Sequence, residues 1–310
     1  MDIALIIILI LLILSLGIMI FAYFKTFYYG KNKTGPYDLP TSPAYEKQKD
    51  HMNNLIKELL DIPYEQIYIL SKDKLKLSAR YYHVDDNSPI QIQCHGYKGN
   101  GIRDFCGGNE LARKLKHNTL IIDQRAHGNS HGHNITFGIK EKDDILCWLN
   151  YCVERFGKDK KIFLVGVSMG AASILMCGED NLPRNVVALI ADSPYSTPSD
   201  IINEVTKQMK LIPWLIYPFI YMSALLFAKV RLNKTSALKA IKNIKIPILI
   251  IHGEKDSLVP CDMSRKLKDA NPQYVELHTF ENADHGLSYI EDPNRYNQIV
   301  TEFLLKIEKA

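Results

Sequence analysis

The sequence has few cysteines, and they form no pattern typical of a metal site or a disulfide framework. The six cysteines, at positions 94, 106, 147, 152, 177 and 261, include no CxxC pair. In a chain of 310 residues this distribution indicates free, mostly buried thiols in a reduced compartment.

The sequence also lacks a block of like charge. Its formal net charge is +4, and the basic residues are spread along the chain. A nucleic-acid partner is therefore not expected. Hydrophobic residues make up 46% of the chain, a normal share for a protein with a folded core.

Charge is missing altogether from residues 3–24, which read IALIIILILLILSLGIMIFAYF. A helix of this length rises about 33 Å, close to the ~30 Å hydrocarbon core of a bilayer. A cleaved signal peptide would have a positive charge before a shorter apolar run and a small-residue cleavage site after it. Here Asp2 precedes a longer run, and no good cleavage site follows. We therefore expect a single-pass transmembrane anchor over residues 1–25.

Basic residues are found on one side of this run only. Lys25, Lys31 and Lys33 follow it, and no Lys or Arg precedes it. The positive-inside rule then predicts that the C-terminal domain lies on the cytoplasmic side of the cell membrane.

Residues 26–60 read as a Pro-rich linker followed by an amphipathic helix at 44–61. From residue 61 to 310, apolar strands alternate with helices, beginning with a hairpin formed by EQIYIL and LKLSARYYHV. Continuous apolar runs such as residues 160–166, 186–193 and 246–253 are typical of strands buried on both faces. The pattern predicts an α/β domain with a mostly parallel central sheet flanked by helices.

The motif GVSMG, residues 166–170, lies between a predicted strand and a predicted helix. A Gly-x-Ser-x-Gly pattern suits a sharp strand-to-helix turn, a nucleophile elbow, in which the serine hydroxyl projects into a cleft. Ser168 is thus a candidate nucleophile, and the alternative reading is a helix N-cap serine.

A serine hydroxyl needs a base to accept its proton and an acid to orient that base. Asp256 follows the strand that ends at IIHG, and His285 follows the next strand, in ENADHG. Taken singly, these two could be a turn residue and a helix-cap residue. Together with Ser168, they form an ordered set of three residues, each just past a predicted strand.

The oxyanion of an acyl-transfer intermediate needs main-chain N–H donors already in place. Met169 follows the candidate nucleophile and supplies one donor. The glycine turn HGYKGN, residues 95–100, offers Tyr97 as the second.

At this point the sequence resembles the α/β-hydrolase superfamily, in the branch of serine aminopeptidase-like and lysophospholipase-like hydrolases. The resemblance covers residues 60–308 and rests on CHGYKGN, DQRAHGNSHG, GVSMG, ADSPY, IPILIIHGEKDSLVP and ADHG. It implies a catalytic triad of Ser168 as nucleophile, Asp256 as acid and His285 as base, with Tyr97 and Met169 as oxyanion donors. Asp192 in ADSPY is the alternative acid, because some members carry the acid one strand earlier.

Three histidines in HGNSHGH, at positions 127, 131 and 133, could begin a zinc site. No acidic or cysteine partner follows them at motif spacing. The resemblance implies that Arg125 and His127 are scaffold residues and leaves His131 and His133 for the edge of the pocket. We expect no metal and no cofactor.

About 50 residues separate ADSPY from the strand at 246, too many for an ordinary loop. We expect a helical cap insertion at about 196–245. Residues 211–228 carry no charge and are long enough for a second span. A single further crossing would, however, separate Ser168 from Asp256 and His285, so cap helices are expected. These would line an acyl pocket, touch the membrane or pack on the core.

The sequence therefore predicts a membrane-anchored serine hydrolase, esterase- or lipase-like, that cleaves a carboxylic ester, thioester or amide through an acyl-enzyme. The apolar cap slightly favours lipid-like substrates. A peptidase that removes N-terminal residues is an alternative, and Glu204 is its candidate anchor for the substrate amine. A non-catalytic binding protein on the same fold is another. The expected partners are a small-molecule ester, acyl or peptide substrate and the membrane.

Overall fold

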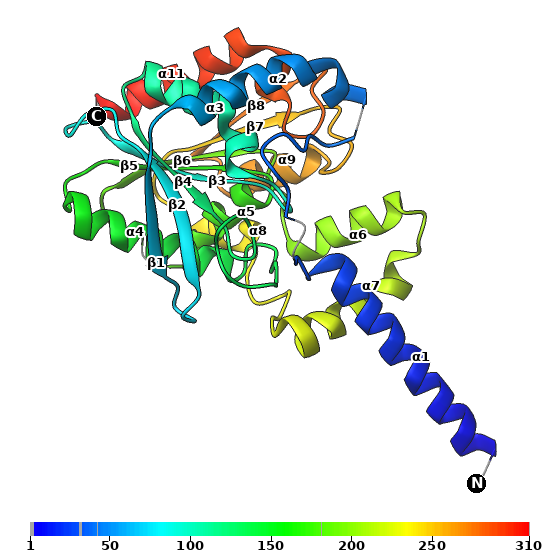
Figure 1. Cartoon of the computed structure of the whole chain (residues 1–310). Helices are drawn as coiled ribbons and strands as arrows, with labels where there is room; N and C mark the ends of the chain where they lie inside the picture. Colours follow the sequence, from blue (N-terminus) through cyan, green and yellow to red (C-terminus); the bar gives the residue numbers. More distant parts are fainter. Residues whose placement is uncertain (1–2, 31–32, 42, 181, 310) are drawn as a thin grey trace.

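The computed structural model describes residues 3–30, 33–41, 43–180 and 182–309. Asp2 and Lys31, on which the predicted anchor and its orientation partly depend, lie outside these residues. One eight-stranded sheet forms the centre of the molecule, with helices on both faces and α1 projecting away from it (Figure 1).

The strands lie in the order β1-β2-β4-β3-β5-β6-β7-β8. β1 pairs antiparallel with β2, and β2 pairs antiparallel with β4, whereas every later pair is parallel. The strands are β1 Glu65–Leu70, β2 Lys76–Tyr82, β3 Ile90–Cys94, β4 Asn118–Asp123, β5 Ile162–Val167, β6 Val186–Asp192, β7 Ile248–Gly253 and β8 Val275–Phe280. The predicted hairpin and the mostly parallel sheet are both confirmed.

Strands β5, β6 and β7 are apolar on both faces because both faces of the sheet are covered there. Every residue of β7 is buried, and its four isoleucine and leucine side chains alternate between two hydrophobic clusters. Continuous apolar strands of this kind are typical of parallel sheets covered by helices on each side.

One face of the sheet carries α2 Pro43–Asp61, α3 Gly101–Lys114 and α11 Pro293–Glu308, with the short α10 Ser288–Glu291. The other face carries α4 Glu141–Phe156, α5 Met169–Met176 and α9 Asp262–Ala270. The amphipathic helix expected at 44–61 is therefore α2. α9 and α10 were not predicted.

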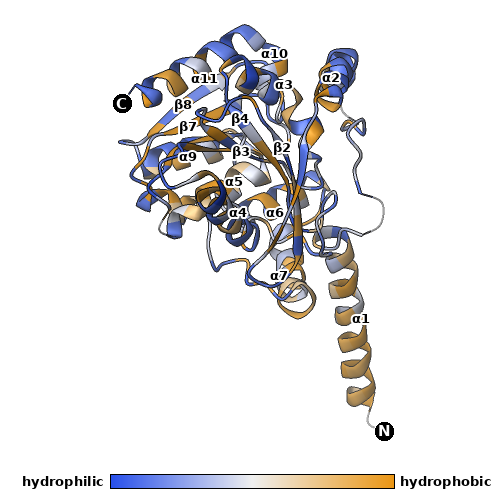
Figure 2. Ribbon diagram, turned by 60° about the vertical axis from the view of Figure 1, so that its left-hand side comes forward, coloured by the Kyte–Doolittle hydropathy of each residue, from blue (hydrophilic) through white to orange (hydrophobic). Residues whose placement is uncertain are grey.

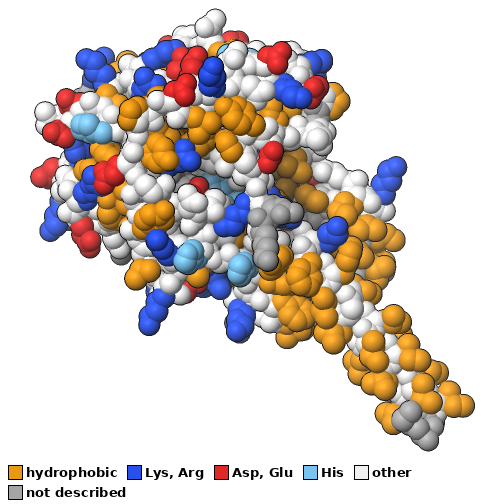
Figure 3. All heavy atoms as spheres, viewed as in Figure 1, with side chains coloured by type: hydrophobic (Ala, Val, Ile, Leu, Met, Phe, Trp, Pro, Cys, Tyr) orange, Lys and Arg blue, Asp and Glu red, His pale blue; other side chains and the backbone are white. Residues whose placement is uncertain are grey.

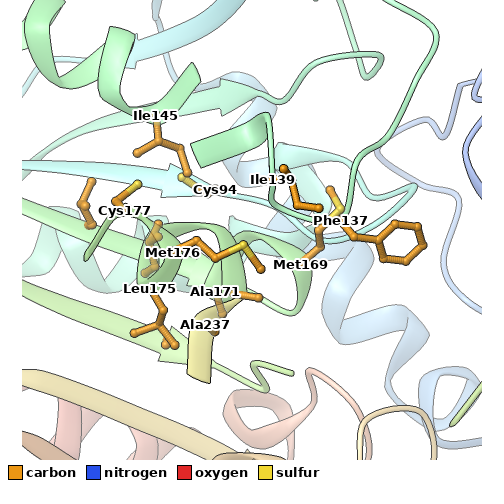
Figure 4. Packing of buried hydrophobic residues seen from close by; sticks show 14 of the residues in the cluster. Cys94, Phe137, Ile139, Ile145, Met169, Ala171, Leu175, Met176, Cys177 and Ala237 are labelled. Atoms are coloured by element: carbon orange, nitrogen blue, oxygen red, sulfur yellow. The ribbon is translucent and has the colours of Figure 1, made fainter. Parts of the chain in front are cut away.

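α5 is short and buried all round, since each of its eight residues is buried. Figure 4 shows its side chains packed against Cys94, Phe137, Ile145 and Ala237, which come from four separate parts of the chain. This packing fixes the start of α5, and therefore the turn that precedes it, against the centre of the sheet.

The segment between β6 and β7 consists of α6 Pro198–Gln208, α7 Pro213–Ser223, the π-helical turn η2 Ala224–Ala228, α8 Ala237–Ala240 and the short η3 Ile241–Asn243. Together with η1 Cys177–Glu179 these complete the helical elements of the described chain. α7 and η2 together are shorter than a membrane span. The expected helices at 199–210 and 211–228 are therefore α6, α7 and η2.

α1 Ile3–Thr26 is long and apolar enough to cross a membrane. Figure 2 shows it as a hydrophobic rod that leaves the folded body near α7. The chain after α1 is attached to the body, because Tyr29 N–H donates to the His133 carbonyl and Ile135 N–H donates to the Phe27 carbonyl, both at 2.8 Å.

Candidate active site

Three of the residues singled out from the sequence follow neighbouring strands at one edge of the sheet. Ser168 follows β5, Asp256 follows β7 and His285 follows β8. The carboxyl ends of parallel strands meet at the same edge, so residues far apart in the chain converge there. Ligands bind in this crevice in open α/β sheets.

The turn at Ser168 is as sharp as the motif predicts. Ser168 has φ 54° and ψ −114°, and its N–H donates to the Asp192 carbonyl at 2.8 Å. The glycines on either side are sterically required. A Cβ at Gly170 would lie 1.9 Å from the Cys94 carbonyl oxygen, and one at Gly166 would lie 2.5 Å from the Ala171 nitrogen.

The three side chains form one hydrogen-bonded line. The Ser168 hydroxyl donates to His285 Nε2 at 2.9 Å, and His285 Nδ1–H donates to Asp256 Oδ2 at 2.7 Å. This arrangement requires a neutral imidazole with its proton on Nδ1. Nε2 is then free to accept the hydroxyl proton.

Asp256 is held by its own loop. Its Oδ1 accepts hydrogen bonds from the Leu258 and Val259 N–H groups at 2.9 and 2.7 Å. The carboxylate is fully buried, whereas the His285 side chain keeps 17% of its surface exposed. The carboxylate therefore cannot rotate away from the imidazole without losing two hydrogen bonds.

Charge and burial act in opposite directions on this pair. Burial by itself would raise the pKa of Asp256, but the charge and hydrogen bond of His285 and the hydrogen bond of His252 hold that pKa well below its usual range. Burial by itself would lower the pKa of His285, but the negative charge and the hydrogen bond of Asp256 outweigh it and raise the pKa above its ordinary value. The pair is thus set for a permanent carboxylate beside an imidazole that gains a proton readily.

Asp192, the alternative acid, is engaged elsewhere. It accepts hydrogen bonds from the hydroxyls of Ser193 and Tyr296 at 2.9 and 3.1 Å. Burial raises its pKa, which opposes a permanent negative charge. In this geometry Asp256, and not Asp192, is hydrogen-bonded to His285.

His252 is a neighbour of Asp256 that was not predicted from the sequence. Its Nε2 lies 2.8 Å from the Val259 carbonyl oxygen and 3.1 Å from Asp256 Oδ2, so Nε2 carries the proton because both partners only accept. Its Nδ1 accepts from the Ser264 hydroxyl at 2.6 Å. The spacing HGEKD places this histidine four residues before the carboxylate, and that spacing was the available signal.

The loop that carries Tyr97 lies against the serine. A Cβ at Gly96 would lie 3.4 Å from Ser168 Cβ. Gly96 N–H donates to Asp104 Oδ2 at 2.9 Å, and Asp104 is paired with Arg103 at 2.7 Å, so a buried charge pair fixes the loop. Within the described chain, the main-chain N–H groups of Tyr97 and Met169 make no hydrogen bond, which leaves both available to an acceptor beside Ser168.

The Tyr97 side chain joins this loop to the end of α1. Its hydroxyl donates to the Thr26 carbonyl at 2.9 Å, and its ring stacks on Phe137 with centroids 5.4 Å apart. Lys98 Nζ donates to the Lys25 carbonyl at 3.2 Å. The last carbonyls of a helix have no partner within the helix, and here the loop next to Ser168 supplies donors to them.

A cavity of about 210 Å³ opens beside Ser168 and His285, on the face of the sheet covered by α2, α3, α10 and α11. Its polar lining comes from Arg103, Asp104 and Asp192 together with glutamine and tyrosine side chains. Among the described residues that line it, none belongs to the segment 196–245. Of the alternatives left open for this segment, a lining of this cavity is therefore not observed, and α7 and η2 pack against α1 instead.

Glu204, proposed from the sequence as an anchor for a substrate amine, is not in this cavity. It lies on α6, pairs with Lys207 at 3.2 Å, and lines a separate groove between α6, α7 and residues 260–266. The peptidase hypothesis therefore loses the one residue that favoured it.

The histidines at 127, 131 and 133 do not form a cluster. His127 is buried, with Nδ1 2.8 Å from the Arg125 carbonyl, whereas His131 and His133 are exposed. No group of three or more metal-ligating side chains occurs in residues 3–30, 33–41, 43–180 and 182–309. Arg125 forms a buried ion pair with Asp144 at 2.6 Å and a partly exposed one with Asp73 at 3.0 Å, as a scaffold residue would.

Comparison with known proteins agrees with this architecture. Residues 92–224 match the family model described as alpha/beta hydrolase fold, and residues 221–304 match that of the dienelactone hydrolase family. An uncharacterized membrane protein of Saccharomyces cerevisiae is 26% identical over 79% of this chain and 81% of its own. The lysophosphatidylserine lipase of Rattus norvegicus is 25% identical over 72% of this chain and 57% of its own.

Among solved structures, an esterase of Pyrococcus furiosus is 28% identical, with a TM-score of 0.67 over 81% of this chain and 93% of that chain. The chain belongs to the α/β-hydrolase superfamily. It is a hydrolase of the esterase- or lipase-like kind.

Proposed function

We propose that this chain is a membrane-anchored serine hydrolase that cleaves carboxylic esters, thioesters or amides through an acyl-enzyme, with lipid-like molecules as its substrates. One observation carries the proposal: the hydrogen-bonded line from Asp256 through His285 to Ser168, with spacings of 2.7 and 2.9 Å. A serine, a base and an orienting acid in this order supply what nucleophilic catalysis by serine requires.

In the proposed reaction, Ser168 Oγ attacks the substrate carbonyl while its proton passes to His285 Nε2. The Asp256 carboxylate holds the imidazole in the required tautomer and stabilises its charged form. The N–H groups of Tyr97 and Met169 donate to the oxyanion. The leaving group departs with the proton from Nε2, and a water molecule then releases the acyl group from Ser168 by the same steps.

The size of the cavity supports a substrate that is only partly enclosed. Pockets for drug-sized ligands span about 300–1,000 Å³, whereas this cavity measures about 210 Å³. It suits the reacting end of an acyl compound while the remainder lies outside. The rat relative's description as a lysophosphatidylserine lipase is consistent with an acyl ester.

In this proposal residues 1–25 form the anchor, residues 26–60 connect it, and residues 61–310 form the catalytic domain with its cap segment at about 196–245. The length and composition of α1 support the anchor, as does the yeast relative's description as a membrane protein. Lys25 in the last turn of α1 and Lys33 after it favour a cytoplasmic catalytic domain.

The test is hydrolysis by the full-length protein, in detergent, of nitrophenyl esters of increasing acyl length and of the matching thioesters and amides. Wild type and Ser173→Ala should turn over at least one of these series, and Ser168→Ala should not. Ser173 lies five residues further along, buried in α5, and is the matched control. Turnover by Ser168→Ala at the wild-type rate, or no turnover of any series by wild type, would contradict the proposal.

A further inference from the structure

The segment around α7 exposes a continuous apolar surface. It consists of residues 209–228, here called the cap surface, and residues 211–228 within it carry no charge. Its exposed side chains are Met209, Leu211, Ile212, Trp214, Leu215, Met222 and Leu226, and Trp214 is 77% exposed. Soluble monomers rarely expose a contiguous apolar surface of this kind without an interaction partner.

The cap surface is continuous with α1. Figure 3 shows hydrophobic side chains running from α1 onto the part of the body at its upper end, and α1 packs along α7 and η2. The covered face of α1 consists of Ser15, Met19, Ala22, Tyr23 and Thr26, which recur at helical spacing. Tyr23 meets Phe227 of η2 with ring centroids 5.5 Å apart.

Because α7 and η2 pack on α1, the depth of α1 in a bilayer determines the depth of α7 and η2. A helix needs about 20 residues to cross the hydrocarbon core, and about 20 residues counted from Ile3 reach Ala22. The stretch from Ser15 to Ala22, which the cap segment covers, therefore lies within or at the edge of the hydrocarbon region. The helices that cover it lie at the same depth.

We propose that the cap surface is immersed in the membrane, in the same leaflet as the C-terminal half of α1, and that the enzyme takes acyl lipids from this leaflet. The proposal rests on the proposed membrane anchor and hydrolase activity. The exposed apolar side chains of α1 require a lipid bilayer around them. The cap surface continues this lipid-facing surface, so the same bilayer covers it.

The charges around the cap surface are consistent with its immersion in this leaflet. Lys210 precedes α7, and Lys229 and Arg231 follow η2, all three exposed. Lys25 lies at the end of α1. Basic side chains at headgroup depth are attracted to anionic lipid, and tryptophan is enriched at the same level.

The active site lies close to this leaflet. The Tyr97 hydroxyl donates to the Thr26 carbonyl at 2.9 Å, so a single side chain separates the end of α1 from the loop beside Ser168. A lipid whose tail stays in the bilayer can present an ester near its headgroup to a cavity in this position. This agrees with a cavity too small for a whole lipid.

The chain offers a direct measurement, because it has two tryptophans and they differ in exposure. Trp214 is 77% exposed on the cap surface and Trp148 is 1% exposed in the core. The full-length protein is reconstituted into phosphatidylcholine and phosphatidylglycerol vesicles that contain lipids brominated either near the glycerol or near the methyl end of the acyl chain. Tryptophan quenching is compared between wild type and Trp214→Phe, which isolates the Trp214 signal, with aqueous iodide as the opposing quencher.

We expect Trp214 to be quenched by brominated lipid, more strongly by the shallow than by the deep label, and to be protected from iodide. Quenching by iodide with none by brominated lipid would overturn the proposal. Protection from both would overturn it in favour of a second copy or another protein on this surface. Extraction with alkaline carbonate is done in parallel. Release of the protein refutes the anchor itself, whereas retention with an iodide-accessible Trp214 refutes only the placement of the cap surface.

A second measurement compares two matched leucines. Leu215 on α7 is 48% exposed and Leu305 on α11, far from α1 in Figure 1, is 41% exposed. We expect Leu215→Glu to lower the ratio of lysophospholipid hydrolysis in vesicles to soluble short-ester hydrolysis by at least severalfold, and Leu305→Glu to leave the ratio unchanged. Equal ratios in the two variants would contradict immersion of the cap surface and uptake of acyl lipids from this leaflet. Failure of wild type to hydrolyse either substrate would instead refute the proposed function.

Discussion

Ser168 adopts a backbone conformation that favours glycine, and this predicts an unusual effect of mutation on stability. Its φ of 54° and ψ of −114° are close to the second position of a type II′ turn, where glycine dominates. Holding a side chain in such a conformation costs of order 1–3 kcal/mol. The strain is maintained by the buried packing of α5 and by the hydrogen bond from Ser168 N–H to the Asp192 carbonyl.

Ser168→Gly removes this strain, and the greater freedom of glycine in the unfolded chain offsets about 0.4–1 kcal/mol of the gain. We therefore expect Ser168→Gly to be more stable than Ser168→Ala by about 1 kcal/mol, or ~2–4 °C in Tm for a domain of this size. Both variants lack the hydroxyl, so the comparison isolates the backbone. Thermal unfolding of the full-length proteins, followed by circular dichroism in one detergent, measures the difference.

Ser173 supplies the control, because it is buried in the interior of the same helix. There the order should reverse, with Ser173→Gly less stable than Ser173→Ala by about 1 kcal/mol. If Ser168→Gly were the less stable of its pair as well, the strain attributed to the turn would be refuted.

Three further predictions concern the loop, the imidazole and the scaffold. Tyr97→Phe keeps the ring and the N–H group but removes the bond to the end of α1, so kcat should fall by up to about tenfold with little change in KM; a change confined to KM would contradict a positioning role. His285 must be neutral to accept a proton, and its pKa is raised, so kcat/KM should fall as the pH drops through a midpoint above about 6.5. Asp256→Asn should move this midpoint to lower pH because it removes the negative charge beside the imidazole. A pH profile with no such shift would contradict the electrostatic pairing. Arg125→Leu leaves the buried Asp144 without its partner and should lower the free energy of unfolding by about 3–5 kcal/mol; chemical denaturation should show partial recovery when Asp144→Leu is added, and an additive further loss would refute the pairing.

The sheet could be predicted from the sequence because several of its parallel strands are continuous apolar runs, which are typical of strands buried on both faces. β7 is apolar at every position but its last two, and its parallel neighbour β6 is apolar at every position but its last. The residues that follow β5, β7 and β8 were therefore expected at one edge, where the structure brings Ser168, Asp256 and His285 within hydrogen-bonding distance. α9 was missed because it is short and rich in charge, and only a few of its residues are buried.

The position of the cap segment could not be predicted in the same way. Periodicity indicates which residues share a face of α7 but not which surface covers that face. The uncharged run 211–228 was compatible with a pocket lining, a membrane contact or core packing, and only the three-dimensional structure shows that α7 and η2 lie against α1 and outside the cavity lining. The contact of His252 with Asp256 could not be predicted for a similar reason. A histidine at the end of an apolar strand is indistinguishable in the sequence from an ordinary core residue, and only the structure shows its contact with Asp256.

The most direct test of the account is the site and rate of labelling by a fluorophosphonate, which reacts with an activated serine. The full-length protein is labelled in detergent, digested, and the modified peptide identified by mass spectrometry, for wild type, Ser168→Ala and His285→Ala. We predict a single adduct on Ser168, none in Ser168→Ala, and labelling at least about 100-fold slower in His285→Ala because the base is gone. An adduct on another residue, or labelling of Ser168 at the wild-type rate without His285, would contradict the claim that these residues form the catalytic machinery.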